Sequence, residues 1–293
     1  MSNIKQFFES RWDDGYIMEA DYSQLEVVIL AILSGDPLLI DDVMSKDMHC
    51  VSTALLTGEP YKTVKHKVDS GDAEWIRTRK KAKALSFALQ YGAGIKALAK
   101  NTKLSEDVCK TFVSNYYKRY SRLASFQKEL ADTVQSTAIP YENEGTLGQR
   151  YMGHYYSPTG RKYTFVQHDA PDWIRSKGEN FSFSPTEMKN YMTQGTASDI
   201  VLMGIASLYR ELYVGEGKAY NRLSIQLINT IHDSVMLDVM MNEVDNAYLA
   251  VYNSLTGARD KASSLFGIDF PLPLKVDVSV GKTWAQTKPY TPE

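Results

Sequence analysis

The sequence predicts an α+β protein in which a small antiparallel sheet is interrupted by a large helical insertion. Segments with the alternating pattern of β-strands lie near both ends of the 293-residue chain, while helical patterns fill most of the middle. A chain of this length can bury a sizeable core, and 43% hydrophobic with 23% charged residues is typical of a globular protein. These features argue against disorder, collagen-like repeats and coiled coil.

The first predicted elements are a short strand at residues 16–21 and a helix at residues 24–33. A polar stretch, residues 62–74, separates them from the next helix, which is expected at about residues 75–91.

The middle of the chain contains two further predicted helices on either side of a region of turns. Ser105, followed by two acidic residues, has the pattern of an N-cap and predicts one long helix to about residue 134. Residues 141–167 are rich in Gly and Tyr, which indicates turns and short strands. Apolar residues at helical spacing then predict a strong helix at residues 196–212.

The last part of the chain returns to the strand pattern. Two β-rich runs, residues 223–231 and 235–239, meet at the tight sequence HDS (232–234), which predicts a hairpin. A helix is expected from about Glu243, and alternating apolar residues at 274–280 predict a final strand.

Composition and charge exclude several classes of protein. With 33 basic and 35 acidic residues the net charge is −2, so a nucleic-acid binder would have to be recognised from local clusters. Cys50 and Cys109 form neither a disulfide framework nor a metal cluster. The longest aliphatic run, residues 27–33, is too short to span a bilayer, and the opening residues lack the pattern of a secretory signal. We therefore expect a soluble, cytoplasmic protein with no membrane partner.

Three short segments stand out as candidates for chemistry, and they occur in a fixed order along the chain. They are Asp21-Tyr22-Ser23-Gln24-Leu25-Glu26 at a strand-to-helix junction, Arg79-x3-Lys83-x3-Phe87-x3-Tyr91-Gly92 on a helix, and Ile231-His232-Asp233-Ser234 at the hairpin tip. Each segment alone has a simple structural explanation. An Asp after a strand is usually a helix cap, a basic stripe on a helix is usually a solvated face, and an HD pair in a hairpin is usually only a turn.

Taken together, the segments favour metal-dependent phosphoryl transfer. Two carboxylates at strand ends of one sheet could face each other, and Mg²⁺ prefers hard oxygen ligands, with one or two protein carboxylates plus substrate phosphates. Two ions about 3.5–4 Å apart activate an attacking hydroxyl and stabilise a leaving oxygen. Arg79 and Lys83, one helical turn apart, could bind a triphosphate, while Tyr91 and Gly92 leave a flat platform for a base.

The three segments resemble motifs A, B and C of family A DNA polymerases, the bacterial polymerase I and T7-like phage group. Motif A of that family resembles DYSQIELR, motif B RxxxKxxxFxxxYG and motif C VHDE, and here the chain has DYSQLEVV, a complete motif B and IHDS. Supporting matches are Ser34-Gly35-Asp36, Asp47-Met48-His49, Asn190-x3-Gln194-Gly195-Thr196-Ala197 and the closing LPLKVDVSVGKTWAQ. The similarity extends along almost the whole chain.

The resemblance implies a polymerase palm, made of a small antiparallel sheet plus helices, with a large helical fingers insertion. Residues 1–45 would be the first palm segment, residues 46–185 the fingers with the motif B helix at about 75–92, and residues 186–293 the second palm segment. The thumb and exonuclease would be absent, and motif A would begin near the start of the chain.

The resemblance also implies a role for each matching residue. Asp21, Asp233 and the backbone carbonyl of Tyr22 would hold two Mg²⁺ ions, with Mn²⁺ as a substitute, and Lys83 would also donate a proton to the pyrophosphate leaving group. The residues expected to bind the dNTP are Arg79, Lys83, Phe87, Tyr91, Gln24 and Glu26, the last as the steric gate against ribonucleotides. The residues expected to contact DNA are His232, Gln194, Asn190 and Gly92, and the basic run at 77–83 adds local positive charge.

Two departures from the family pattern leave alternatives open. Ser234 replaces the acid usual in motif C and is common in single-subunit RNA polymerases, although those enzymes lack the glutamate found here as Glu26. An RNA polymerase fragment and a non-catalytic assembly or DNA-binding subunit are therefore the alternatives to a DNA polymerase. The early position of motif A predicts one chain of a split phage polymerase, with a cloned fragment as the alternative. The expected partners are primer-template DNA, dNTP and a second chain with the thumb, the remaining palm and, in some versions, a 3′–5′ exonuclease.

Overall fold

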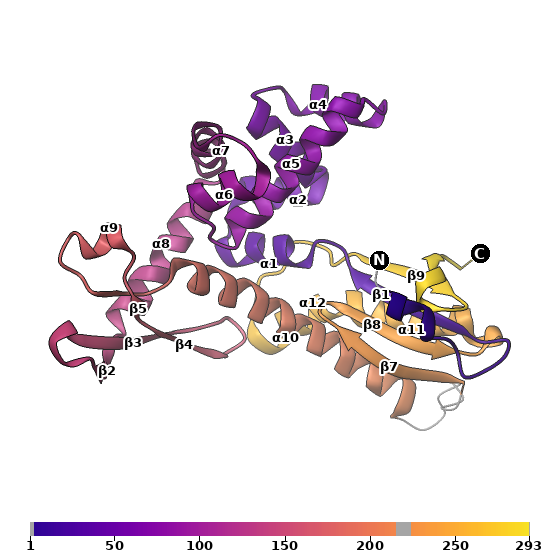
Figure 1. Ribbon diagram of the computed structural model, residues 1–293. Helices are drawn as coiled ribbons and strands as arrows, with labels where there is room; N and C mark the ends of the chain where they lie inside the picture. Colours follow the sequence, from indigo (N-terminus) through magenta and orange to yellow (C-terminus); the bar gives the residue numbers. More distant parts are fainter. Residues whose placement is uncertain (1–2, 215–223, 293) are drawn as a thin grey trace. The chain divides into compact units, whose positions relative to one another are not determined.

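The computed structural model describes residues 3–214 and 224–292 (Figure 1). The chain forms two compact units: residues 1–28 with 196–293, and residues 29–195. The boundaries fall within two helices, α1 (Leu25–Ser34) and α10 (Pro185–Tyr213). The assignment of residues 1–45, 46–185 and 186–293 to palm and fingers stays a prediction.

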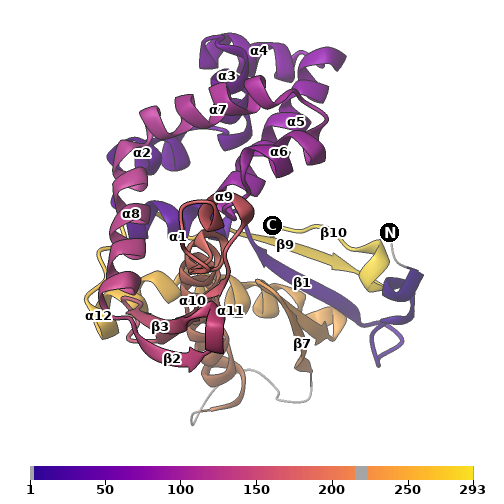
Figure 2. The same ribbon diagram turned by 60° about the vertical axis from the view of Figure 1, so that its left-hand side comes forward.

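The first unit contains a five-stranded antiparallel sheet built from both ends of the chain, as the sequence predicts. The strand order is β10-β9-β1-β8-β7, so the N-terminal strand lies between strands from the C-terminal part (Figures 1 and 2). The strands are β1 (Tyr16–Tyr22), β7 (Ile225–Ile231), β8 (Ser234–Val239), β9 (Val276–Gly281) and β10 (Lys288–Pro289).

The predicted strands and helices of this unit are found with small shifts. Strand β7 begins at Ile225, and Leu223, which the predicted strand included, lies outside the described residues. The last strand begins at Val276 rather than at Leu274. The remaining elements of the unit are the short 3₁₀-helices η1 (Asn3–Phe7), η3 (Met241–Glu243) and η4 (Trp284–Gln286), and the helices α11 (Val244–Thr256) and α12 (Ala258–Phe266).

The two faces of the sheet have different surroundings. On one face, Ala20 and Tyr22 are paired in register with the buried Val278 and Val276, and the Tyr22 hydroxyl donates a hydrogen bond of 2.8 Å to the Leu255 carbonyl of α11. On the other face, Ile17 packs with Met236 and Trp284 in a small buried cluster. Alternation along β1 therefore places Glu19 and Asp21 on the same face as Ile17, beyond that cluster.

The second unit is mainly helical. Its helices are α2 (Pro37–Ser45), α3 (Met48–Thr57), α4 (Tyr61–Asp69), α5 (Ala73–Gln90), α6 (Ile95–Thr102), α7 (Glu106–Arg119), α8 (Ser121–Ser136) and α9 (Asp172–Arg175). The Gly- and Tyr-rich region forms the predicted turns and short strands, namely β2 (Ile139–Asn143), β3 (Gln149–Tyr156), β4 (Lys162–Val166), β5 (His168–Asp169) and β6 (Phe181–Ser182), with the 3₁₀-helix η2 (Gly145–Leu147). Part of the polar stretch at 62–74 is helical as α4, which buries Val64 completely.

The single long helix predicted from Ser105 to residue 134 is wrong, because the helix breaks at Tyr120 into α7 and α8. The side chain of Asp36 accounts for the break. One of its carboxylate oxygens caps α2 by accepting hydrogen bonds from the N–H groups of Leu38 and Leu39. The other accepts hydrogen bonds of 2.9 and 3.1 Å from the N–H groups of Arg122 and Leu123, in the first turn of α8. One buried carboxylate thus satisfies the otherwise unpaired donors of two helix N-termini.

Other helix boundaries also differ from the prediction. The helix predicted at residues 196–212 begins much earlier, at Pro185, and continues to Tyr213. The helix predicted at 24–33 begins at Leu25, because Gln24 has a φ of 57° in the left-handed region.

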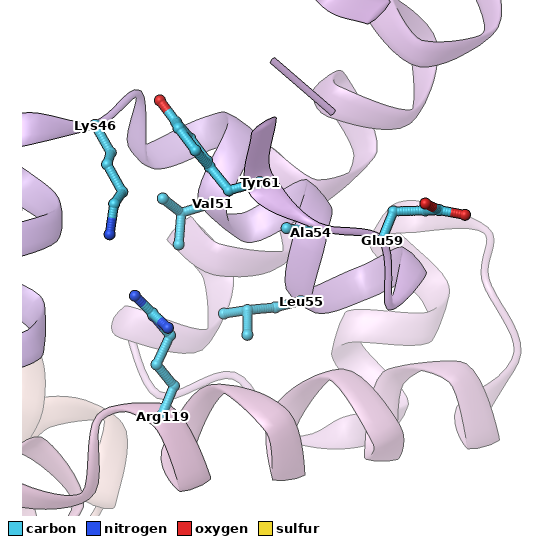
Figure 3. A pocket seen from close by; sticks show the side chains of 7 residues that line it. All are labelled: Lys46, Val51, Ala54, Leu55, Glu59, Tyr61 and Arg119. Carbon is cyan, nitrogen blue, oxygen red and sulfur yellow. The ribbon is translucent and has the colours of Figure 1, made fainter. Parts of the chain in front are cut away.

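A second buried carboxylate, Asp42 of α2, is fully buried beside the junction of α7 and α8. Arg119 donates two hydrogen bonds of 2.7 Å to it, and Tyr120 and Lys46 donate one each, of 2.7 and 2.6 Å. Figure 3 shows the Lys46 and Arg119 side chains pointing toward one another at one end of a cavity of about 320 Å³. The apolar side chains of Val51, Ala54 and Leu55 and the ring of Tyr61 line the cavity beside them, and Glu59 lies at its other end.

Candidate active site

The structure brings Asp21 and Asp233 together at one end of the sheet of the first unit. Asp21 is the penultimate residue of β1 and is paired in register with Ser234, the first residue of β8. Asp233 lies in the two-residue turn between β7 and β8, and its carbonyl accepts a hydrogen bond of 3.4 Å from the N–H of Tyr22. The two aspartates therefore come from adjacent strands although 212 positions separate them (233 − 21).

His232 forms the first half of the same turn. Its φ of 55° lies in the left-handed region, which a tight turn between two paired strands requires and which is uncommon for a residue other than glycine. Its side chain is exposed at the hairpin tip. The predicted contact of His232 with DNA stays a prediction.

The electrostatic surroundings of Asp21 are strongly negative. Partial burial, followed by the negative charges of Asp233, Glu19 and Asp277, raises the pKa of Asp21 from 3.8 to about 6, and the positive charge of Lys5 opposes this rise only in part. A carboxylate surrounded by other carboxylates is stabilised when a cation binds. The site thus has the hard oxygen donors and the excess negative charge that suit a divalent metal ion.

The donor set fits ions that are shared with a substrate better than an ion held by protein alone. Among the described residues, no group of three or more His, Cys, Asp and Glu side chains is arranged to hold a metal ion. A pair of aspartates with additional oxygens from substrate phosphates is the usual arrangement for Mg²⁺ at phosphoryl-transfer sites. The ring of Tyr22 is buried on the opposite face, so only its backbone carbonyl is a candidate for the predicted third ligand.

Two residues beside Asp21 define the rest of this face. Ser234, where the family motif has an acid, is buried and its hydroxyl donates a hydrogen bond of 3.0 Å to the Ile231 carbonyl across the hairpin turn. Asp277 of β9 is paired in register with Asp21 on its other side and accepts a hydrogen bond from the Ser23 hydroxyl. Asp277 was not predicted from the sequence, because an acidic residue at an outward position of an alternating strand is usually only solvent-exposed.

The motif A residues after Asp21 lie at the start of α1. Gln24 is exposed, and its carbonyl accepts hydrogen bonds of 3.1 Å from the N–H groups of Val27 and Val28 as the helix begins. Glu26 is half-buried in the first turn of α1. Their predicted contacts with a nucleotide remain predictions.

The motif B residues form one stripe on α5 in the second unit. The Lys83 ammonium lies 5.5 Å from the centre of the Phe87 ring, and Tyr91 caps the C-terminus of the helix. Arg79 is bound by Asp47, at the N-terminus of α3, with N–O distances of 2.8 and 3.0 Å. The predicted stripe is therefore present, and its arginine is already paired with an acid of the same unit.

His49, which in the sequence is only part of the supporting match Asp47-Met48-His49, belongs to the same cluster. Its ring centre lies 5.8 Å from that of Phe87. Burial, followed by the positive charges of Lys83 and Arg79, lowers the pKa of His49 from 6.5 to about 4. At neutral pH the ring is therefore uncharged, and it can donate or accept a hydrogen bond beside two cations.

The remaining predicted DNA-contacting residues lie at the end of motif B and on α10. Gly92 has a φ of 82°, and a Cβ atom there would come within 2.8 Å of the Thr186 Cα atom, so this position requires glycine. Asn190 is half-buried, and its side-chain oxygen has no hydrogen-bond partner among the described residues. Gln194, one turn further along α10, is exposed. No helix among the described residues is long and apolar enough to cross a membrane.

The fold resembles that of a solved structure. A structure described as the POL domain of Pol1 from M. smegmatis in complex with DNA primer-template and dNTP superposes with a TM-score of 0.70 and 20% sequence identity, over 96% of this chain and 42% of that chain. A sequence profile of the family described as DNA polymerase family A matches residues 1–286. The chain belongs to DNA polymerase family A.

Similar curated proteins are bacterial DNA polymerases I. The protein from Lactococcus lactis subsp. lactis (strain IL1403) is 25% identical over 286 residues, which cover 97% of this chain and 27% of that protein. The protein from Caldicellulosiruptor bescii is 26% identical over 274 residues, which cover 93% of this chain and 27% of that protein. The chain thus spans about a quarter of the length of these relatives.

Proposed function

We propose that this chain catalyses template-directed DNA synthesis, the transfer of a dNMP from a dNTP to the 3′-hydroxyl of a primer. The observation that carries the proposal is the pair Asp21 and Asp233, which the pairing of β1 with β8 brings together, with the further negative charges of Glu19 and Asp277 acting on Asp21. Membership in DNA polymerase family A, whose similar members include DNA polymerases I, supports the same reaction.

In this proposal Asp21, Asp233 and the carbonyl of Tyr22 hold two Mg²⁺ ions, or Mn²⁺ in their place. The ions, when bound, make the primer hydroxyl a better nucleophile and neutralise the charge that develops on the leaving pyrophosphate. The protein residues contribute position and fixed charge, which phosphoryl transfer chiefly requires.

The other residues of the three motifs bind the substrates. Arg79 and Lys83 bind the triphosphate, and Lys83 donates a proton to pyrophosphate as it leaves. Glu26 excludes the 2′-hydroxyl of a ribonucleotide. The residues proposed to contact the nucleotide sugar and base are Phe87, Tyr91 and Gln24, and those proposed to contact the DNA are His232, Asn190, Gln194 and Gly92.

A further part of the proposal concerns how the polymerase is divided between polypeptides. The chain acts as the palm and fingers subunit of a split, phage-type polymerase in the cytoplasm of the host cell. In this arrangement a second polypeptide supplies the thumb and the remaining palm, with or without a 3′–5′ exonuclease.

Primer extension tests the proposed reaction. The chain is isolated through an affinity tag from the cells in which it is naturally made, so that associated polypeptides remain bound, and is assayed with dNTPs and Mg²⁺. Asp21→Asn and Asp233→Asn should each lower the extension rate by several orders of magnitude. They should leave primer-template affinity nearly unchanged, because phosphate contacts supply most of that affinity.

A matched control is Asp14→Asn, which removes an exposed carboxylate from the turn before β1. Its extension rate should equal that of the wild type. Near-normal extension by either active-site variant would refute the site assignment.

A further inference from the structure

Strand β9 places an acidic side chain directly beside Asp21. In the register of the sheet, Asp21 is opposite Ser234 of β8 on one side and opposite Asp277 of β9 on the other. Residues directly opposite each other in antiparallel strands extend from the same face of the sheet. Positions 234 and 277 therefore flank Asp21 on the face that carries the proposed metal ligands.

The two flanking positions differ in charge. Ser234 is neutral, 4% exposed, and uses its hydroxyl within the hairpin turn. Asp277 is exposed and accepts a hydrogen bond from Ser23, which follows the metal-binding segment of β1. Its negative charge acts on the Asp21 carboxylate. Glu19 also acts on Asp21, but the Lys5 ammonium lies 3.9 Å from Glu19 and offsets part of its charge.

We infer that Asp277 is a positioning residue for the metal site. Asp277 supplies from β9 the negative charge that is missing at position 234 of β8. This inference rests on the proposed function, because it concerns the affinity of the Asp21 and Asp233 pair for divalent ions. Asp277 acts through its charge across one strand spacing, and through its hydrogen bond it also holds the chain where β1 passes into α1.

A unit charge about one strand spacing from a divalent ion, in a partly solvated site, changes the dissociation constant of that ion by a factor of a few to about tenfold. The effect should therefore be measurable as metal affinity without any DNA or nucleotide present. The probe is Mn²⁺, whose free concentration is followed by electron paramagnetic resonance at neutral pH. Asp21→Asn defines the background of weak sites on the surface.

The variants separate charge from hydrogen bonding. Asp277→Asn removes the charge but keeps an oxygen that accepts the Ser23 hydrogen bond, and it should raise the Mn²⁺ dissociation constant about fivefold. Asp277→Glu keeps the charge and should stay within about twofold of the wild type. Ser23→Ala removes the hydrogen bond and no charge, and it should also stay within about twofold. Asp14→Asn, an exposed acid at the far end of β1, is the control for net charge.

Moving the charge from one side of Asp21 to the other is the sharpest version of the test. Ser234→Asp in the Asp277→Asn background should recover most of the lost affinity. Position 234 is nearly buried, so circular dichroism and thermal melting are used to establish that the double variant folds. If the double variant does not fold, the inference is tested by comparing the Mn²⁺ affinities of Asp277→Asn and Asp277→Glu.

The outcomes separate this inference from the proposed function. If Asp277→Asn binds Mn²⁺ as tightly as the wild type while Asp21→Asn does not, the inference is overturned and the proposed function stands. If Asp21→Asn also binds like the wild type, the aspartate pair holds no ion in the absence of substrate and the inference is overturned, while primer extension by Asp21→Asn and Asp233→Asn still decides the proposed function. A fivefold loss in Asp277→Asn that is absent in Asp277→Glu and Ser23→Ala supports the inference.

Discussion

The guanidinium group of Arg79 is bound by the carboxylate of Asp47, which lies 32 positions earlier and caps the N-terminus of helix α3. The same carboxylate accepts hydrogen bonds of 2.9 and 3.0 Å from the N–H groups of His49 and Cys50. Burial favours the neutral acid, but the hydrogen bonds from Arg79 and the backbone outweigh it and lower the pKa of Asp47. Asp47 thus links the N-terminus of α3 to the arginine of motif B.

Replacing Asp47 should separate its two roles. Asp47→Ala removes both the helix cap and the partner of Arg79, and should lower the free energy of unfolding by about 2 kcal/mol. Asp47→Asn keeps an oxygen that caps α3 while removing the charge, so it should be about 1 kcal/mol more stable than the alanine variant. Urea unfolding measures both values. Equal stabilities would show that the cap contributes nothing at this position.

Asp42 should make the stability of the second unit depend on acid pH. Burial raises its pKa, but hydrogen bonds from Arg119, Lys46 and Tyr120 outweigh burial, so the pKa of Asp42 lies below the ordinary value of 3.8. The unfolded chain therefore binds a proton at a higher pH than the folded chain does. The stabilisation is complete above about pH 4 and is lost as the pH falls through the lower, folded-state pKa.

The matching variant is Asp42→Asn. It should be destabilised by about 3 kcal/mol at neutral pH, because it leaves Arg119 and Lys46 without their buried partner. Melting temperatures recorded from pH 7 down to pH 3 should show the gap between wild type and variant narrowing below about pH 4. A gap that widens in acid would contradict the assigned direction of the pKa shift.

A comparison of Gly92 with Gly58 tests the close approach of the Thr186 backbone to the end of motif B. Both have a positive φ, of 82° and 79°, but a Cβ atom would contact Thr186 only at Gly92, whereas nothing lies within 4 Å at Gly58. Gly58→Ala should cost about 1 kcal/mol, from the backbone conformation alone. Gly92→Ala should cost about 1–3 kcal/mol more, because the neighbouring atom is backbone and must shift. Chemical denaturation of both variants checks the difference, which would vanish if α10 adjusts freely.

The sequence was sufficient where the structure depends on local pattern. The start of strand β9 alternates buried and exposed residues with the period of a strand, and the hairpin at His232 and Asp233 follows from two β-rich runs that meet. The motif B helix could also be predicted from a local pattern, because its apolar and basic residues recur at helical spacing.

The features that were missed depend on residues far apart in the chain. The break at Tyr120 follows from Asp36, whose carboxylate reaches N–H groups 86 and 87 positions away, and no local pattern predicts such a contact. Asp277 became a candidate only when the register placed β9 beside β1. His49 was likewise recognised through its contact with Phe87 and its depressed pKa rather than through its neighbours in sequence.

Glu26 should decide which sugar the enzyme accepts. In the proposed function its side chain occupies the space that a 2′-hydroxyl would need, from the first turn of α1 and close in sequence to Asp21. Glu26→Ala should raise the use of rNTPs relative to dNTPs and lower overall efficiency. The ratio of kcat/KM values for a dNTP and the matching rNTP measures the effect. An unchanged ratio would count against the gate and favour the RNA polymerase alternative.

A second polypeptide should associate with this chain in its native cell. Strand β7 is at one end of the strand order in the described sheet. The Tyr213 hydroxyl of α10 accepts a hydrogen bond of 2.8 Å from the Leu227 N–H and donates one of 3.4 Å to the Ile225 carbonyl, so pairing with another strand is confined to the part of β7 beyond Leu227, where Ile228 is 38% exposed. A net charge of −2 provides little long-range attraction for DNA, so the binding of a duplex needs a further positively charged element.

We expect the tagged chain to be isolated in a stoichiometric complex with a polypeptide that carries the thumb and the remaining palm, through an interface as large and apolar as those of obligate complexes. The complex should extend primers efficiently, whereas the 293-residue chain alone should be weakly active and prone to aggregate.

Size-exclusion chromatography with light scattering gives the stoichiometry, and primer extension on a long template compares the two preparations. Charge-reversed Lys100→Glu, on an exposed position of α6, serves as a control that should leave the complex intact. Processive synthesis by the isolated chain would rule out the need for a partner, because every contact that holds the duplex would then come from these residues alone.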